Sequence, residues 1–106
     1  MWFVFPQIAG LGRTEISRFF ALADRAEAQA YVRHAVLGPR LRECTDAMLG
    51  WAGRRYAERI LGPIDALKFK SSMTLFEACA PDPASFAAAL DAFYGGERDV
   101  MTLDRL

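Results

Sequence analysis

The chain has 106 residues, of which 53% are hydrophobic and 12% aromatic, and its thirteen basic side chains balance thirteen acidic ones. A chain of this length and hydrophobicity is typical of one core, so we predict a single domain over residues 1–106. Because the net charge is zero, no long-range attraction favours nucleic acid or an anionic membrane surface, and we predict neither as a partner.

The chain opens with the apolar run MWFVF, which Pro6 interrupts. Five residues are too few for a transmembrane helix, which needs about 20 apolar residues. The run also lacks the basic segment and the small-residue cleavage site of a secretory signal. Cys44 and Cys79 form no C-x-x-C pair, and we expect them to be reduced, small apolar side chains. These features together predict a cytoplasmic protein.

Apolar residues recur at helical spacing along most of the chain. The sequence contains no Asn-Gly hairpin signal, no long alternation of apolar and polar residues, and no internal repeat. The predicted helices cover approximately residues 15–23, 24–35, 39–52, 56–61, 63–78 and 83–94, with a final turn from residue 99. We therefore predict an all-α fold, a compact bundle of about five or six short helices.

Start and stop signals support several of these boundaries. Asp24 followed by Glu27 resembles a capping box, in which the first side chain accepts a hydrogen bond from the backbone of the second. Pro39 and Pro63 fit first helical positions, where the missing N–H has no intrahelical partner. Gly95 is expected to end the preceding helix because glycine readily adopts the left-handed conformation.

The segment DALKFKSSMTLFEACA is apolar around most of its predicted helix. On a helical wheel the buried stripe contains Ile64, Leu67, Leu75 and Ala78, widened by Phe69, Met73, Phe76 and Cys79. The positions left for solvent are Ala66, Lys70, Thr74 and Glu77. A helix with so narrow a polar face is expected to lie at the centre of the bundle.

Lys68, Ser71 and Ser72 nevertheless fall within the apolar sector, and their spacing places the three side chains together. Two interpretations are open. In the simpler one, the hydroxyls bond the carbonyls of Leu67 and Lys68 one turn back, and the lysine stem lies on apolar surface while its ammonium reaches water. In the other, the three residues form a cationic, hydroxyl-rich site for a polar or anionic ligand, because unpaired buried polar groups cost about 1–3 kcal/mol each.

A second candidate site is the glycine-rich turn GLGRT, which contains Gly10, Gly12 and Arg13. A glycine turn that leads into a helix exposes backbone amides and a positive dipole end to an anion. The motif lacks the third glycine of a dinucleotide fingerprint and the Lys-Ser/Thr ending of a P-loop. A plain turn that lets two helices approach is the alternative interpretation.

His34 is the only histidine. It falls near the end of the second predicted helix, where the negative dipole end favours a protonated capping residue. One histidine and two distant cysteines cannot supply a typical zinc site, so no metal is predicted, and no cofactor motif is found. Arg42 and Asp46 have the spacing of an ion pair on a solvated helix face.

Four motifs, MWFVFPQ, GLG, AYVRH followed by LGPRL, and above all KFKSSMTLFEA, give the chain a family resemblance. It resembles the bacterial proteins of domain of unknown function 1810, which are often labelled calpastatin. The resemblance spans nearly the whole chain and implies an all-helical fold with no established activity. The calpastatin label does not fit, because calpain inhibitors of that kind are disordered and repetitive whereas this chain is hydrophobic and free of repeats.

Members of that family typically carry an amphipathic helical segment ending in His-Trp before the Met-Trp-Phe run. The resemblance therefore implies that Met1 corresponds to an internal position and that the aromatic opening is a core segment without its preceding helix. Ala35 stands where the family tends to have proline, and Phe20 where tyrosine is common, so no role of that hydroxyl carries over. An apolar opening that has lost part of its cover is expected to favour self-association.

Two functions follow from these features. The first is binding of a small polar or phosphate-bearing ligand, such as a nucleotide or an ADP-ribose-like compound, with hydrolysis or transfer as the reaction class and Lys68 as electrostatic stabiliser. The candidate ligand-binding residues are Trp2, Gln7, Gly10, Gly12, Arg13, Lys68, Ser71 and Ser72. The alternative is an interaction module without chemistry, in which the apolar opening face and Trp51, on the apolar side of the third predicted helix, receive a partner helix or a second copy of the chain.

Overall fold

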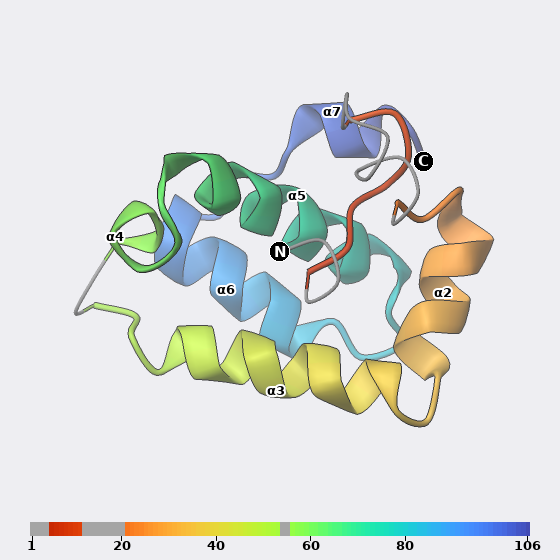
Figure 1. The fold of residues 1–106 in the computed structure, drawn as a ribbon, viewed down its shortest axis with the longest axis horizontal. Helices are drawn as coiled ribbons and strands as arrows, with labels where there is room; N and C mark the ends of the chain where they lie inside the picture. The colour runs from red at the N-terminus through yellow and green to blue at the C-terminus, as the bar shows by residue number, and fades with distance from the viewer. Residues whose placement is uncertain (1–4, 12–20, 54–55) are drawn as a thin grey trace.

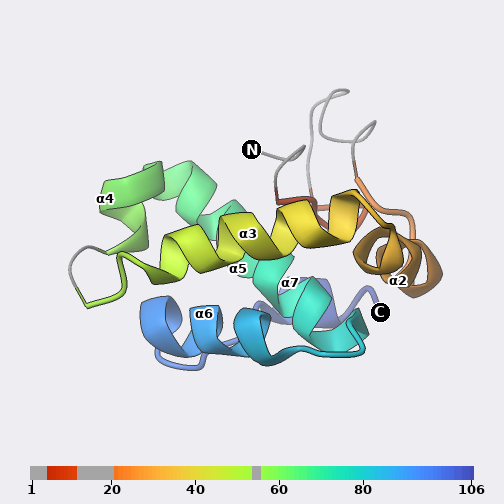
Figure 2. The same cartoon turned by 90° about the horizontal axis from the view of Figure 1, so that it is seen from below.

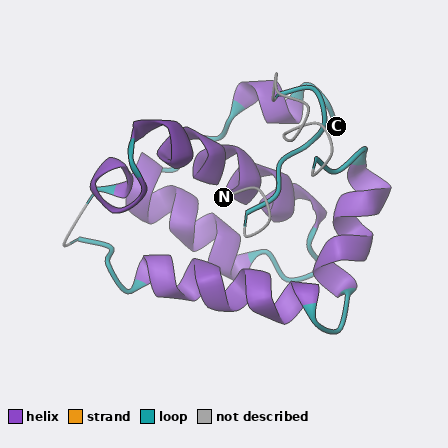
Figure 3. Cartoon of the chain, in the orientation of Figure 1, coloured by secondary structure: helices purple, strands orange, loops and turns teal. Residues whose placement is uncertain are grey.

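Residues 5–11, 21–53 and 56–106 are described by the computed structural model of the chain. The helices within these ranges are α2 (Arg25–Arg33), α3 (Leu37–Leu49), α4 (Ala57–Leu61), α5 (Pro63–Cys79), α6 (Ala84–Tyr94) and α7 (Val100–Leu103). The described residues form helices and connecting loops without a β-strand (Figures 1 and 3). The predicted all-α bundle of five or six short helices is therefore confirmed.

Helix α5 is the centre of the bundle. It packs against α2, α4, α6 and α7, and it lies between α6 and the segment of residues 5–11 (Figure 2). Phe5 from that segment meets Phe69 edge to face, with 4.7 Å between the ring centroids, and Phe76 contacts Phe86 of α6 at 5.7 Å. Contacts on several sides explain why the sequence of α5 is apolar around most of its circumference.

Local signals placed most helix ends correctly. Asp24 caps α2, because its Oδ1 accepts a hydrogen bond from the N–H of Glu27 at 2.9 Å. Pro63 occupies the first turn of α5, and Gly95 ends α6 in the left-handed conformation with a φ of 62°. Helix α3 differs, since it begins at Leu37, two residues before the predicted start at Pro39.

The α2–α3 corner explains the earlier start of α3. The His34 Nδ1 accepts hydrogen bonds from the N–H groups of Val36 at 3.1 Å and Leu37 at 3.2 Å, and so caps the beginning of α3. His34 is also the C-cap of α2, so the predicted capping residue at the end of that helix is confirmed. Gly38 lets the helices approach closely, because a Cβ there would lie 2.2 Å from the carbonyl oxygen of Val32.

Residues 5–11 are held beside the chain around Leu22. The N–H of Ala9 donates to the carbonyl of Leu22 at 2.7 Å, and the N–H of Leu22 donates to the carbonyl of Gln7 at 2.8 Å. Most of the predicted helix over 15–23 lies outside the described residues. Its last three positions are not helical, because the backbone of Leu22 pairs with a neighbouring segment instead of a preceding turn.

The predicted solvent face of α5 is wrong at both edges. Ile64 is 71% exposed and Leu67 is 67% exposed, although the wheel placed both in the buried stripe, and Ala78 is exposed as well. Ala66 and Thr74, which were assigned to solvent, are buried. The cause is tertiary: the chain after α6 covers the Thr74 side, whereas one side of the first two turns of α5 remains open.

Two further expectations fail on α3 and the turn after it. Trp51 follows the end of α3 and is 46% exposed, so it does not line the apolar side of that helix. Arg42 and Asp46, both among the described residues, form no ion pair. A surface pair of this kind gains little because the attraction is screened and two long side chains must be ordered.

The two leucines of α5 test the observed orientation of the helix. Leu75→Ala should lower the free energy of unfolding by about 2–5 kcal/mol, because it opens a cavity beside a fully buried side chain. Leu67→Ala makes the same chemical change two turns away at an exposed position and should change that free energy by less than about 0.5 kcal/mol. Urea denaturation of both variants measures the difference. Equal losses would place both leucines in the core, as the wheel did.

Candidate functional site

A hollow of about 350 Å³ lies between α5, the C-terminal segment and the N-terminal residues 7–11. We call it the α5–α7 hollow. It is lined by Gln7, Leu11, Ile64, Leu67, Lys68, Lys70, Ser71, Asp99 and Met101. Three of the residues proposed from the sequence, Gln7, Lys68 and Ser71, therefore lie around one hollow, although the first is 61 residues from the second in the chain.

Of the other candidate residues, Gly10 and Ser72 are described, and neither lines the α5–α7 hollow. Trp2, Gly12 and Arg13 lie outside the described residues. Gly10 is exposed, and the guanidinium of Arg105 lies beside its Cα. Gly10 is thus the one glycine of the predicted turn whose position is described, and it does not line the hollow.

Ser72 is fully buried and contributes nothing to the lining of the hollow. Its hydroxyl has no hydrogen-bond partner, so the bond to the carbonyl of Lys68 expected in the simpler interpretation does not form. Ser71 does bond the carbonyl of Leu67, at 3.2 Å, as that interpretation requires. The two serines thus have different environments, and only Ser71 belongs to the candidate site.

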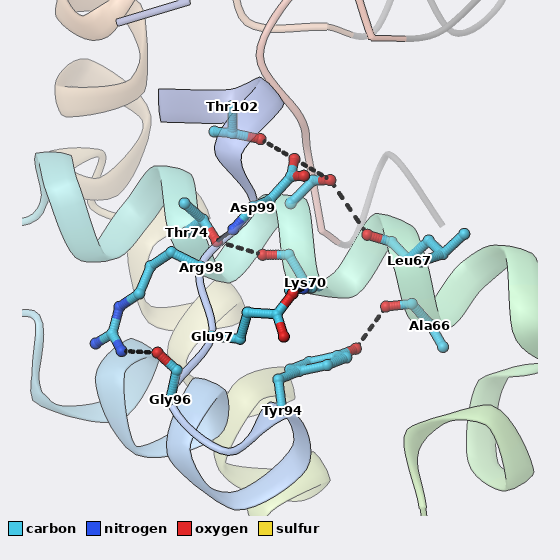
Figure 4. A network of polar contacts seen from close by, with 11 residues as sticks. Ala66, Leu67, Lys70, Thr74, Tyr94, Gly96, Glu97, Arg98, Asp99 and Thr102 are labelled. Carbon is cyan, nitrogen blue, oxygen red and sulfur yellow. Dashed lines mark hydrogen bonds and ion pairs between the residues drawn. The ribbon is translucent and has the colours of Figure 1, made fainter. Parts of the chain in front are cut away.

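Asp99 is the polar centre of the hollow. Its Oδ2 accepts a hydrogen bond from Ser71 Oγ at 2.8 Å and another from Thr102 Oγ1 at 2.5 Å. Ser71 has one hydroxyl hydrogen, so it donates either to Asp99 or to its own helix. The two bonds join α5 to the start of α7 (Figure 4) and hold the carboxylate of Asp99, one of the residues that line the hollow.

The backbone of Asp99 is fixed as well. Its N–H donates to Thr74 Oγ1 at 3.0 Å, and that hydroxyl donates to the carbonyl of Lys70 at 2.8 Å. Thr74 is completely buried, so its hydroxyl needs these partners. Asp99 was not among the residues predicted from the sequence. The one local signal for it is the Asp-x-x-Thr spacing to Thr102, which is typical of a side chain that caps a turn.

The hollow contains charges of both signs. Lys70 is committed elsewhere, since its Nζ lies 2.7 Å from Glu97 Oε1 and 5.8 Å from the centre of the Tyr94 ring. Lys68 is half-buried and is another of the cationic residues that line the hollow. Oδ1 of Asp99 accepts no hydrogen bond from the described residues, and so this carboxylate can still receive a donor from a ligand.

The end of α6 and the segment that follows it are attached to α5. Tyr94 donates from its hydroxyl to the carbonyl of Ala66 at 2.5 Å (Figure 4). Arg98 pairs with Glu77. Burial raises the pKa of Tyr94, and the nearby Glu58 charge adds to the rise. These contacts place Asp99 at a defined position along α5.

The described residues include no group of three or more histidine, cysteine, aspartate or glutamate side chains with metal-site geometry. Within the same ranges, no helix has the length and apolar character needed to cross a membrane. The lining combines apolar side chains, among them Ile64, Leu67 and Met101, with polar and charged ones. Such a mixture of apolar surface and a few polar groups is typical of small-molecule sites.

The comparison with known families agrees with the helical architecture. Residues 1–106 match the family model described as a protein of unknown function, DUF1810. The chain belongs to this family. No curated protein matches it significantly. Among solved structures, the DUF1810 chain is similar to the conserved hypothetical protein Rv1873 from Mycobacterium tuberculosis, with 44% identity and a TM-score of 0.93 over 99% of this chain and 74% of that one.

Asp99 should stabilise the DUF1810 fold through its two hydroxyl donors. Asp99→Ala leaves the hydroxyl of Thr102 without its acceptor and leaves Ser71 only the carbonyl of Leu67, so we expect a loss of about 1.5–3 kcal/mol in the free energy of unfolding, measured in urea. Asp104→Ala, which removes an exposed carboxylate five residues later, is the control and should have little effect. In a Thr102→Val background the cost of Asp99→Ala should fall. An unchanged cost would show that the two side chains do not interact.

Tyr94 should make stability depend on alkaline pH. Because burial raises its pKa in the folded state, the unfolded state loses the proton first, so the stabilising contribution is complete below about pH 10 and is lost as the pH rises through the folded value. Tyr94→Phe should therefore flatten the fall in unfolding free energy between about pH 9 and pH 11. Tyr56→Phe, at a side chain that is 78% exposed, should keep the slope of the unmodified chain. Identical slopes in all three proteins would contradict the assignment.

Proposed function

We propose that this DUF1810 chain binds a small polar, phosphate-bearing ligand of the nucleotide class, including ADP-ribose-like compounds, in the α5–α7 hollow. The observation that carries the proposal is the convergence of Gln7, Lys68, Ser71 and Asp99 on one hollow that also has apolar lining residues. The hollow has about 350 Å³, which is within the range of about 300–1,000 Å³ typical of small-molecule sites.

The arrangement of charges favours a ligand with two different polar ends. Lys68 attracts a phosphate, whereas Oδ1 of Asp99 accepts from a hydroxyl or amino group. A bare anion would gain from the lysine and lose to the carboxylate in the same hollow. A ribose phosphate carries both a negative group and vicinal hydroxyls, and therefore satisfies both residues.

The remaining lining residues suit the rest of such a ligand. Gln7 has an amide that both donates and accepts, so it can orient either a sugar hydroxyl or a base edge. Leu67, Ile64 and Met101 offer apolar surface for one face of a planar base. Placing these exposed side chains against a ligand would remove apolar area from water, which stabilises the complex.

The hollow supplies one catalytic element, should a reaction follow binding. Hydrolysis or group transfer builds negative charge on phosphate or leaving-group oxygens, and the Lys68 ammonium would stabilise that charge. Oδ2 of Asp99 accepts hydrogen bonds from the hydroxyls of Ser71 and Thr102. We therefore assign the other oxygen, Oδ1, to orienting a hydroxyl group of the ligand. Turnover is measured separately, on any compound that binds.

The test compares thermal shifts in a panel of ADP-ribose, NAD, AMP, adenosine and inorganic phosphate. A ligand at about 100 times its Kd adds about 2.7 kcal/mol, which raises the Tm of a domain of this size by several degrees. Ribose phosphates should raise the Tm more than adenosine or phosphate alone. Lys68→Gln should abolish most of this shift, whereas Arg59→Gln, which removes an exposed charge on the neighbouring helix α4, should preserve it.

Calorimetric titration of the best compound provides the second readout. Ser71→Ala should weaken binding at the same site. A flat panel, or a shift that survives Lys68→Gln unchanged, contradicts the proposal. Sedimentation of the unmodified chain over a range of concentrations then tests the alternative, an interaction module, which is supported by the exposed apolar side chains of Leu67, Met101 and Leu103.

A further inference from the structure

A second hollow, of about 300 Å³, lies at the α2–α3 corner. We call it the α2–α3 hollow. Its lining residues are Val32, Arg33, His34, Ala35, Gly38, Pro39, Arg42 and Pro81. It shares no residue with the α5–α7 hollow, so the two can be tested independently. No aspartate or glutamate is among its lining residues, in contrast to the other hollow.

The side chains of two arginines line this hollow. Among the described residues, the guanidiniums of Arg33, in the last turn of α2, and Arg42, in the middle of α3, form neither an ion pair nor a hydrogen bond. Asp46, one turn after Arg42, does not neutralise it. Two other arginines of the described residues do have partners, since Arg25 donates to the carbonyl of Ala78 and Arg98 pairs with Glu77. Two unneutralised guanidiniums on one concave surface create a local positive potential.

His34 adds a fixed hydrogen-bond donor to the same lining. Its Nδ1 accepts two backbone hydrogen bonds, so the neutral imidazole must carry its hydrogen on Nε2. The capping role of this ring therefore also determines its second function, because the tautomer that caps α3 is the one that leaves an N–H available. A histidine held in this way loses little freedom when it binds a ligand.

The backbone at the beginning of α3 provides no donor for a ligand. The N–H groups of Val36 and Leu37 donate to His34 Nδ1, and that of Gly38 donates to the carbonyl of the same residue at 3.1 Å. Pro39 has no N–H. Recognition at this corner must come from side chains, and the side chains present are two guanidiniums and one imidazole N–H.

We propose that the α2–α3 hollow binds a tetrahedral oxyanion, a phosphate or sulfate group, through Arg33, Arg42 and the Nε2–H of His34. Guanidinium groups match the oxygen geometry of phosphate and donate charge-assisted hydrogen bonds. The rigid surfaces of Pro39 and Pro81 complete the wall around these donors. This site differs from the α5–α7 hollow in preferring the bare anion, because no carboxylate opposes it.

The only histidine of the chain is the reporter for this site. The imidazole resonances are followed by NMR while sodium phosphate, and separately sodium sulfate, is added at fixed pH and at an ionic strength held constant with sodium chloride. Phosphate should move these resonances along a saturable curve. Arg33→Gln or Arg42→Gln should each raise the apparent Kd about tenfold or more, as expected for loss of a charge-assisted contact.

Two matched variants complete the design. Arg40→Gln removes an exposed arginine from the same helix that does not line the hollow, and the response should persist. Lys68→Gln should leave it unchanged, so failure of the proposed nucleotide site and failure of this site are distinguishable. The proposal is overturned if the imidazole response is linear up to high phosphate, if it is the same in the Arg33 and Arg42 variants as in the unmodified chain, or if Arg40→Gln weakens it equally.

Discussion

The burial of α5 on almost all sides is the constraint on which the rest of the structure depends. A helix with this many neighbours must bury the polar residues that lie among its apolar ones, and each of these then needs a partner within the chain. Thr74 and Ser71 obtain partners from the segment between α6 and α7, through the backbone and the carboxylate of Asp99. The C-terminal turn is therefore attached to the core by hydrogen bonds more than by apolar contact. Asp99 lines the α5–α7 hollow because it supplies hydrogen-bond partners to the buried hydroxyl groups of the central helix.

The hollow itself results from incomplete cover at one end of α5. The middle of the helix is enclosed, but its first two turns leave Ile64 and Leu67 exposed. Gln7 and Leu11 of the N-terminal segment, and Asp99 and Met101 at the start of α7, line the space beside this region. Apolar and polar side chains are thereby brought together around one hollow. Ser72, the residue after Ser71, contrasts with it because it is fully buried and cannot reach a ligand. Its hydroxyl has no hydrogen-bond partner among the described residues, which costs about 1–3 kcal/mol.

Local chemistry determined what could be predicted from the sequence. Asp24, Pro63 and Gly95 act through their own backbone conformation and nearest neighbours, so the ends of α2, α5 and α6 were predictable. The orientation of α5 was not, because an almost uniformly apolar helix gives a wheel too little contrast to define a solvent side. Asp99 was missed for a related reason: its role depends on Ser71, 28 residues earlier, and no local spacing relates the two.

The distribution of charge illustrates the same limit. A net charge of zero produces no long-range attraction to a charged partner, but it averages over local sites whose charges differ. On the C-terminal side of the fold, Lys70 and Arg98 are neutralised by Glu97 and Glu77. At the α2–α3 corner, the side chains of Arg33 and Arg42 have no carboxylate partner among the described residues. The Nδ1 of His34 accepts the backbone N–H groups that begin α3, so Nε2 is the ring nitrogen that can donate to a ligand. A neutral chain can thus contain one hollow of mixed charge and one that is cationic, and only the second is suited to a bare anion.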